Sequence, residues 1–471
     1  MIFSKKTFFK ISVLLAMSGA FVFAQESQPQ NTESDKKTVN LTIYEAVDYA
    51  LEHSHSLKTA DIDLEIKARA GKNAWNVLLP TVQATGTLNR TTDISSNLSG
   101  TNTMMKLHGL PEIEETDSMK WTGIANLSVV WNFSLAMIQQ IRAAKAGYEA
   151  GKISYEQSIV ETEVNVKKLF YGLLLQQENL NLQKTTLENS RKRMVQAEAN
   201  FKNGMVPELS MLQAQVTYQN KSPEVAQMER EFHQQLDTFA FLLGLPVGTD
   251  IVLQGSIEPF YVDLHYDTLI ERYGNNSLDL QSIDKSIEQL QRNLDALNLS
   301  TYTPFFNISY GFKPMLTDFL DADKGGFPTG GDWTDSGSIS FTIGWNLTNI
   351  LPFSSNRQQA KDLQANLDKL KVSREMLLEN QKMTVRKSVD TLIQAREQIQ
   401  SMNRSITLAQ RSYDMTVRAY RNGTRELLDV RDAENQLNTA KLGLANQKFN
   451  YISALLDLET TLNTKLTGGE K

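Results

Sequence analysis

The sequence contains no cysteine, so it can form neither a disulfide framework nor an amino-terminal lipid anchor on a cysteine. Beyond residue 24 no stretch approaches eighteen continuous apolar residues, which excludes a helical membrane anchor there. The five histidines show no zinc-ligand spacing, because His53 and His55 are two residues apart and the others are isolated. No nucleophile elbow or phosphate-binding loop occurs. We therefore expect neither an enzyme nor a metal or cofactor site.

The charge balance and the first residues indicate an exported protein. Residues 1–24 combine three lysines, an apolar run over 11–24 and a small-residue cleavage site at the end, which predicts a signal peptide. A transmembrane anchor is the alternative, but about fourteen apolar residues fall short of the roughly twenty that a spanning helix needs. Removing three lysines would lower the formal net charge from −6 to −9, which argues against nucleic acid. The polar residues 25–40 predict a flexible leader.

Two passages 219 residues apart follow the same pattern. The first, from Phe201 to Gln215, reads FKNGMVPELSMLQAQ, and the second, from Tyr420 to Glu434, reads YRNGTRELLDVRDAE. In each, a helical pattern pauses at Asn-Gly and resumes within a few residues. Glycine adopts positive φ without steric cost, and asparagine tolerates it better than most residues, so each passage predicts the tip of an αα-hairpin.

Apolar residues recur every seven positions on both sides of each tip, and the two copies align without a gap over about eighty positions. We interpret the chain as a tandem duplication of one long helical hairpin, with a supercoil imposed by the seven-residue repeat. An ordinary coiled coil is the alternative, although the polar or small companion positions suit the wall of a water-filled tube better. The first copy carries Ile159, Val166, Leu173, Leu180, Leu187, Met194 and Phe201, and the second Leu378, Val385, Leu392, Ile399, Ile406, Tyr413 and Tyr420.

These patterns divide the chain into a first repeat over residues 41–260, a second over 261–466 and a disordered tail over 467–471. The long hairpins are expected over 135–243 and 354–463. Each ascending helix would be on the order of 100 Å long, at 1.5 Å per residue. The first repeat begins with a helix expected from Leu41 to Leu79, and Ser222-Pro223 predicts a kink or restart, with Ser222 as the cap of the new segment. A short helix is expected near 264–272.

Four segments change from helical spacing to strict alternation of apolar and polar residues, which predicts β-strands. They lie at about 81–90, 121–133, 305–313 and 333–347. Polar loops are expected between the members of each pair. An edge hairpin of a soluble sheet is the alternative interpretation.

Tryptophans bracket two of these strands and favour a membrane. Trp121 and Trp131 enclose one strand, and Trp333 and Trp345 enclose the other. Ten residues at about 3.3 Å each, tilted by about 40°, cover roughly 25 Å along the membrane normal. That matches the apolar band of an outer-membrane barrel, where aromatic residues mark both interfaces.

Four strands cannot close a barrel, and an open sheet edge in lipid would leave backbone groups unpaired. The sequence therefore predicts a mainly α-helical chain whose four strands contribute to a β-barrel shared between copies and whose hairpins form a periplasmic helical tube. Two, three or four copies are all consistent with the strand count.

The chain resembles the TolC-type outer-membrane efflux protein family over most of its length. The resemblance rests on LTIYEAVDYAL near the start, WNVLLP before the first strand, the paired FKNG and YRNG tips, LLGLP at the middle and GTRELLDVRDAENQL after the second tip. It implies a homotrimer with a twelve-strand barrel in outer-membrane lipid and a twelve-helix periplasmic tunnel. It also implies an exit duct with a gated periplasmic end, which docks to a periplasmic adaptor and an inner-membrane transporter.

By that resemblance, Tyr420, Arg425, Asp429 and Asp432 stand at gate positions, and copies of the two aspartates around a constriction would attract cations. A solvated charged face is the alternative. Ser210 stands where the family pattern suggests a carboxylate, which leaves a salt bridge from Arg425 to the first tip in question. The tip residues are the candidates for adaptor contact: Asn203, Gly204, Met205, Asn422, Gly423 and Thr424.

A periplasmic coiled-coil adaptor or scaffold without a membrane barrel is the rival function. It would share the long hairpins but not the tryptophan-bracketed strands. The sequence does not identify the cargo, because drugs, metals, siderophores and polypeptides would pass through the same kind of tube.

Overall fold

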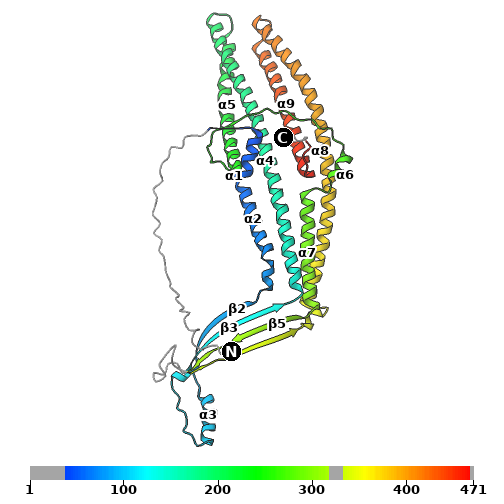
Figure 1. Ribbon diagram of the computed structural model, residues 1–471. Helices are drawn as coiled ribbons and strands as arrows, with labels where there is room; N and C mark the ends of the chain where they lie inside the picture. The colour runs from blue at the N-terminus through cyan, green and yellow to red at the C-terminus, as the bar shows by residue number, and fades with distance from the viewer. Residues whose placement is uncertain (1–37, 318–331, 467–471) are drawn as a thin grey trace.

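The computed structural model describes residues 38–317 and 332–466. The expected signal peptide, most of the leader and the expected tail lie outside these residues. The molecule is elongated, with a β-sheet at one end and two helical hairpin tips at the other (Figure 1). Long helices run the whole distance between them, so a single chain connects the two ends several times.

Two long helical hairpins dominate the chain and repeat each other residue for residue. In the first, α4 (Ala136–Lys202) leads to α5 (Glu208–Leu243); in the second, α8 (Ser355–Arg421) leads to α9 (Leu427–Leu462). Both ascending helices have 67 residues and both descending helices have 36. Each boundary in the second hairpin lies 219 positions after its counterpart, the offset seen in the sequence.

The seven-residue stripe is buried in the middle of the hairpins and open near the tips. Val166, Leu173 and Val385 are fully buried, whereas Phe201 is exposed and Tyr420 is half-buried. Thr162, Ser190 and Gln381, at the polar companion positions, are also buried. The stripe therefore holds each hairpin together near the middle of its length, whereas the part of the stripe near the tips leaves apolar side chains exposed.

Helix α5 continues through Pro223, so the expected restart with Ser222 as a cap is wrong. Proline lacks the N–H that would bond to the carbonyl four residues earlier. That carbonyl belongs to Gln219, and both Gln219 and Pro223 are exposed. Water can satisfy the freed carbonyl there, so the helix does not need to end.

The single helix expected from Leu41 to Leu79 is wrong. The structure has β1 (Val39–Leu41), α1 (Ile43–His53), α2 (His55–Lys72) and a 3₁₀ turn, η1 (Ala74–Leu78), in its place. The capping box of Thr42 with Glu45 does open α1. Ser54 breaks the helix with an extended backbone, at φ −55° and ψ 132°.

The middle of the chain is tied together by a pairing that the sequence pattern did not reveal. Strand β1 pairs in parallel with β4 (Ile251–Leu253), which lies in the linker between the repeats. Apolar residues of both strands join Phe170 and Phe239 in one buried core. The linker continues through α6 (Tyr266–Tyr273) and α7 (Leu278–Tyr302) to the second pair of strands.

The linker is fixed to the second hairpin, and the start of α7 is fixed to α4, where the amide of Gln157 donates to Asp279, at 2.8 Å. The backbone N–H of Val262 donates to the hydroxyl of Tyr451, at 3.2 Å, and Tyr451 is buried. Glu163 of α4 pairs with Lys167, at 2.5 Å, and with Lys465, at 3.4 Å. Its side chain is only 19% exposed.

Four main strands form an antiparallel sheet at the end opposite the tips. They are β2 (Thr81–Arg90), β3 (Trp121–Phe133), β5 (Phe305–Phe312) and β8 (Gly337–Gly344), paired in that order. Short strands β6 (Met315–Thr317) and β7 (Asp332–Thr334) extend the distal end beside β3.

Two details of the sheet differ from the sequence prediction. The strand expected over 333–347 is divided into β7 and β8, because Asp335 and Ser336 leave the strand conformation between them. The loop expected after β2 contains a helix, α3 (Ser95–Leu107), which projects beyond the sheet (Figure 1). The side chain of Asn102 closes this connection between β2 and β3 through two hydrogen bonds with the backbone of Ile113, at 2.8 and 3.0 Å.

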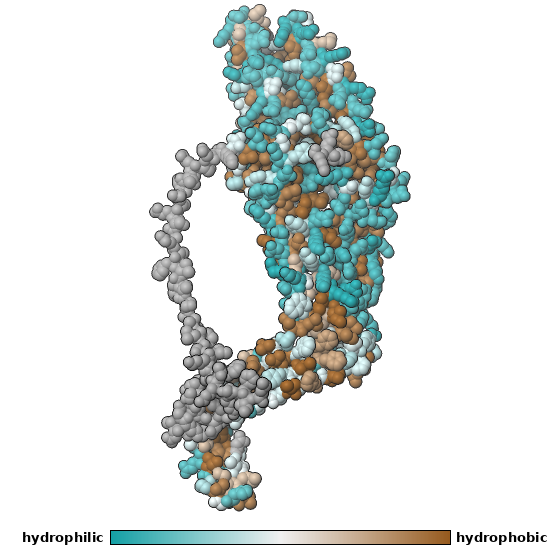
Figure 2. Space-filling view, viewed as in Figure 1, coloured by the Kyte–Doolittle hydropathy of each residue, from teal (hydrophilic) through white to brown (hydrophobic). Residues whose placement is uncertain are grey.

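Apolar side chains cover the sheet without being buried by this chain. Every residue of β2 is exposed, and Ile339, Phe341 and Ile343, which share one face of β8, are 64%, 78% and 72% exposed. Figure 2 shows apolar residues gathered over the sheet and the adjoining helix ends, whereas the helical part is mostly hydrophilic. None of the helices within residues 38–317 and 332–466 combines the length and apolar character that crossing a bilayer demands.

Candidate functional site

Both hairpin tips are built by the same turn. Gly204 and Gly423 adopt positive φ, at 69° and 74°. The following residues, Met205 and Thr424, donate their backbone N–H groups back to the last helical turn, at 2.8 and 3.0 Å. This closes the helix end and reverses the chain. The six tip residues expected to contact an adaptor are exposed: Asn203, Gly204, Met205, Asn422, Gly423 and Thr424.

Three of the four expected gate residues line one depression beside the second tip. Arg425, Asp429 and Asp432 surround a space of about 440 Å³ between α8 and α9. The guanidinium of Arg425 lies 3.7 Å from the carboxylate of Asp429. Asp429 also accepts the backbone N–H of Glu426, at 3.1 Å, and so helps to cap α9. Asp429 therefore has a local structural role in addition to its charge.

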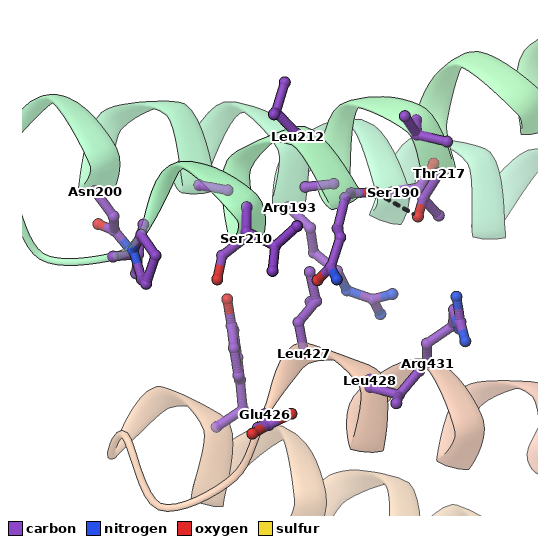
Figure 3. Close-up of a pocket in the computed structure, with 18 residues that line it drawn as sticks. Ser190, Arg193, Asn200, Ser210, Leu212, Thr217, Glu426, Leu427, Leu428 and Arg431 are labelled. Carbon is purple, nitrogen blue, oxygen red and sulfur yellow. Dashed lines mark hydrogen bonds between the residues drawn. The ribbon is translucent and has the colours of Figure 1, made fainter.

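Tyr420 lies in a different place from the other three. It lines a larger groove, of about 930 Å³, between the two hairpins. Across this groove Arg193 and Ser210 of the first hairpin face Glu426 and Leu427 of the second (Figure 3). Within the described part of the chain, Arg425 forms an ion pair with Asp429 in the first turn of α9 and none with the first tip. The structure thus does not gather all four expected gate residues on one surface of the chain.

A buried polar link between the hairpins was not expected from the sequence. Arg193 of α4 pairs with Glu434 of α9, with Nη1 2.7 Å from Oε2. The other carboxylate oxygen of Glu434 accepts the amide of Asn189, at 2.9 Å, and Arg193 also donates to the hydroxyl of Tyr413, at 3.3 Å. The side chains of Arg193 and Glu434 are 18% and 6% exposed.

The electrostatics of this link favour the charged state. Burial alone would lower the pKa of Arg193, but hydrogen bonding to Glu434 and the charge of that carboxylate outweigh it and raise the pKa above its ordinary value. Arg193 also lines the groove between the hairpins. The link therefore joins the two repeats at the base of the groove, and the tips extend beyond it. In the sequence, Glu434 lies between Ala433 and Leu437, two apolar residues that are buried. A charged residue among apolar ones was the signal that could have revealed this buried link.

The four tryptophans that bracket the predicted strands lie at two ends of the sheet. Trp131 and Trp345 lie near the helices, where their indole N–H groups donate to the carbonyls of Leu78, at 2.8 Å, and Thr301, at 3.2 Å. Trp121 begins β3 at the distal end, and the backbone of Trp333 pairs there with Leu316. Strand β3 thus separates Trp121 from Trp131.

The part of the chain that the structure describes contains no group of three or more histidine, aspartate or glutamate side chains arranged to hold a metal ion.

Comparison with known proteins identifies relatives over most of the chain. A family model described as outer membrane efflux protein matches residues 46–245 and 269–464. Nodulation protein T from Rhizobium leguminosarum bv. trifolii is 20% identical over 376 residues, which cover 77% of this chain and 76% of that protein. Outer membrane protein TolC from Escherichia coli (strain K12) is 35% identical over a shorter stretch of 81 residues, 17% of this chain and 16% of TolC.

Solved structures share the fold. The CmeC outer membrane channel of Campylobacter jejuni aligns with a TM-score of 0.69 at 17% identity, covering 91% of this chain and 87% of that one. The combination of two long hairpins and a sheet therefore occurs in a known channel.

Proposed function

Since this chain belongs to the outer membrane efflux protein family, we propose that three copies close into one barrel and one tube with a gate at the hairpin tips. The family is one of channels. The chain is an outer-membrane exit duct that reaches into the periplasm and serves efflux. This family assignment replaces the alternative of a periplasmic scaffold without a barrel.

The free edges of the sheet are the observation that carries the proposed closure. Within residues 38–317 and 332–466, β2 pairs only with β3, and β8 pairs only with β5. In lipid, unpaired backbone groups on these edges would cost several kcal/mol each. Pairing β2 of one copy with β8 of the next removes both edges, and three copies of the four main strands give a twelve-strand barrel.

The apolar surface and the tryptophans support placing this sheet in lipid. One face of β8 presents three exposed apolar side chains, at positions 339, 341 and 343. Trp131 and Trp345 would mark the periplasmic interface, and Trp121 and Trp333 the outer one, since tryptophan prefers the headgroup level. The 67 residues of α4 and α8 would then extend on the order of 100 Å into the periplasm.

The gate is proposed at the second tip. Asp429 and Asp432 lie close to the end of the tube on the same depression. Three copies of each would place six carboxylates around the constriction and favour cations. Tyr420, in the groove between hairpins, would control their spacing rather than contribute charge. The exposed tip turns would contact a periplasmic adaptor, which links the duct to an inner-membrane transporter.

Selectivity in planar bilayers tests the gate. We expect Asp429→Asn with Asp432→Asn to lower the ratio of cation to anion permeability and to preserve channel formation, since the side-chain oxygen of asparagine at 429 can still accept the N–H of Glu426. Asp368→Asn, on α8 far from the tip, is the matched control and should leave the ratio unchanged. An unchanged ratio in the double variant would remove the gate assignment.

Native mass spectrometry of the detergent-solubilised protein tests the trimer, and a monomer there would contradict the proposed closure.

A further inference from the structure

The exposed face of α8 near the second tip carries a stripe of arginines. Arg404, Arg411 and Arg418 are spaced by seven residues, which places them on one face about 10.5 Å apart. Leu408 and Met415 lie between them on the same face and are 67% and 71% exposed. The basic stripe is defined here as these three arginines and two apolar residues.

The arginines lack a partner in the part of the chain that the structure describes. Within the ranges that the structure describes, none of the three guanidinium groups forms an ion pair or a side-chain hydrogen bond. The nearest acid on α8 is Asp414, whose carboxylate accepts the amide of Gln410, at 3.0 Å. Below Arg404, the preceding heptad position is Glu397, so the stripe is confined to the tip-proximal part of the helix. Three unpaired cations stand out on a chain with a net charge of −6.

The internal repeat shows that this stripe belongs to one hairpin only. The matching positions of α4 are Thr185, Lys192 and Ala199, with Asn189 and Gln196 in place of the apolar pair. Solvation of a long helix does not require the arginines, because α4 has the same length and position in the fold without them.

The repeat also indicates which side of the wall the stripe occupies. Helix α4 contacts α5 through Glu198 and contacts α9 through Arg193. At 100° per residue, the contact with α9 lies roughly 100° and the contact with α5 roughly 240° from Lys192 around α4, and Lys192 lies in the larger of the two arcs between them. The larger arc is the convex side of a curved wall. Lys192 is exposed there although both neighbours are in place.

By the same geometry, the arginines of α8 remain on the convex side after neighbouring hairpins have closed around it. We propose that the basic stripe binds an acidic amphipathic α-helix of a periplasmic partner, with carboxylates at seven-residue spacing and apolar residues between them. Such a helix would pair its carboxylates with Arg404, Arg411 and Arg418 and pack an apolar residue on Met415. Leu408 lies at the edge of this surface toward the neighbouring hairpin, because its counterpart Asn189 contacts α9 in the first repeat. The inference rests on the proposed function, because it takes the helices to stand in the periplasm.

The test uses the full-length protein in detergent and a synthetic helical hairpin peptide with glutamate at every seventh position and leucine between. Fluorescence anisotropy would give its Kd. We expect Arg404→Glu, Arg411→Glu and Arg418→Glu together to raise the Kd about tenfold or more, since each exposed pair contributes up to about fivefold. The matched control is Thr185→Glu, Lys192→Glu and Ala199→Glu in the first repeat, which should change the Kd less than twofold.

Two further measurements complete the test. A peptide with lysine in place of glutamate should bind the triple arginine variant and not the unaltered protein, and raising the salt from 50 to 300 mM should weaken binding by screening. An unchanged Kd in the arginine variant, or an equal loss in the first-repeat control, would overturn the proposal. Conductance in planar bilayers separates the docking proposal from the proposed function. If the protein forms channels but its affinity for the peptide does not depend on the basic stripe, only the docking surface is refuted. If it forms no channels, the duct is refuted.

Discussion

Replacing Glu434 by glutamine tests whether the link between hairpins fixes the position of the tips. The substitution keeps the side-chain volume but removes the negative charge beside Arg193, whose side chain is only 18% exposed. Glutamine has one acceptor oxygen where the carboxylate has two, so it cannot accept from both Arg193 and Asn189. The guanidinium would keep its hydrogen bond to the hydroxyl of Tyr413. Because the tips extend beyond this link, its loss should let the two hairpins separate.

The expected magnitude follows from the burial of the pair. Removing one partner of a fully buried ion pair costs about 3–5 kcal/mol. Arg193 retains some water contact and one neutral partner, so we expect about 2 kcal/mol for Glu434→Gln. That shifts the equilibrium between joined and separated hairpins roughly thirtyfold, at 1.4 kcal/mol per factor of ten.

Spin labels can measure this separation directly, because the chain has no cysteine of its own. Cysteines at Lys202 and Arg421, the last residues of α4 and α8, would report the distance between tips by pulsed electron resonance. We expect a broader distribution with longer distances in Glu434→Gln. Glu188→Gln is the matched control, since that carboxylate is 49% exposed and its nearest cation lies 3.6 Å away.

Exchange of the two charges provides the decisive comparison. Arg193→Glu with Glu434→Arg keeps an ion pair between the same helices and should restore a narrow distribution. Distances that stay the same in Glu434→Gln, or that broaden equally in Glu188→Gln, would refute the assignment of this link.

Two further predictions concern stability. Gly204→Ala should lower the free energy of unfolding by about 1 kcal/mol, because φ is positive there but an added Cβ would have no neighbour within 4 Å. Gly244→Ala should cost several-fold more, since its Cβ would lie 2.4 Å from the carbonyl oxygen of His53. Thermal unfolding followed by circular dichroism ranks the two variants, and the reverse order would contradict the steric reasoning. For Glu163, burial alone would raise the pKa, but hydrogen bonds and charges from its lysine partners hold that pKa below the ordinary 4.5. A lowered carboxyl pKa stabilises the fold above the unfolded value and loses that effect as pH falls through the folded value, so Glu163→Gln should flatten the fall in melting temperature below about pH 4.5; parallel pH profiles would argue against it.

The long hairpins could be predicted because their signals are local and repeated. A seven-residue stripe, an Asn-Gly turn and a second copy of both specify where α4 and α8 end, since each signal depends on residues a few positions apart. The break at Ser54 could not be predicted this way, because the residues around it are compatible with a continuous helix. What favours the break is packing of α1 onto the core beside Phe239, which only the tertiary structure reveals.

The candidate site was predictable to the same extent. The turn residues and the charges of the second tip follow from the sequence near Gly423. The pairing of Arg193 with Glu434 does not, because it joins residues 241 positions apart and depends on how the two repeats lie side by side. The parallel pairing of β1 with β4 was missed for a related reason: each strand has three residues, too few for alternation to show.

The two repeats differ where neighbouring hairpins meet, and this difference bears on how the closed end would open. Arg193 and Glu434 correspond by the 219-residue offset to Ser412 and Gln215. In the proposed trimer, α8 of one copy would lie beside α5 of the next as α4 lies beside α9 within a copy, and that contact would join a serine and a glutamine rather than two opposite charges. A neutral hydrogen bond contributes about half as much as a charge-assisted one. Separation between copies would therefore cost less than separation within a copy, so each hairpin pair should move as one body when the tube opens.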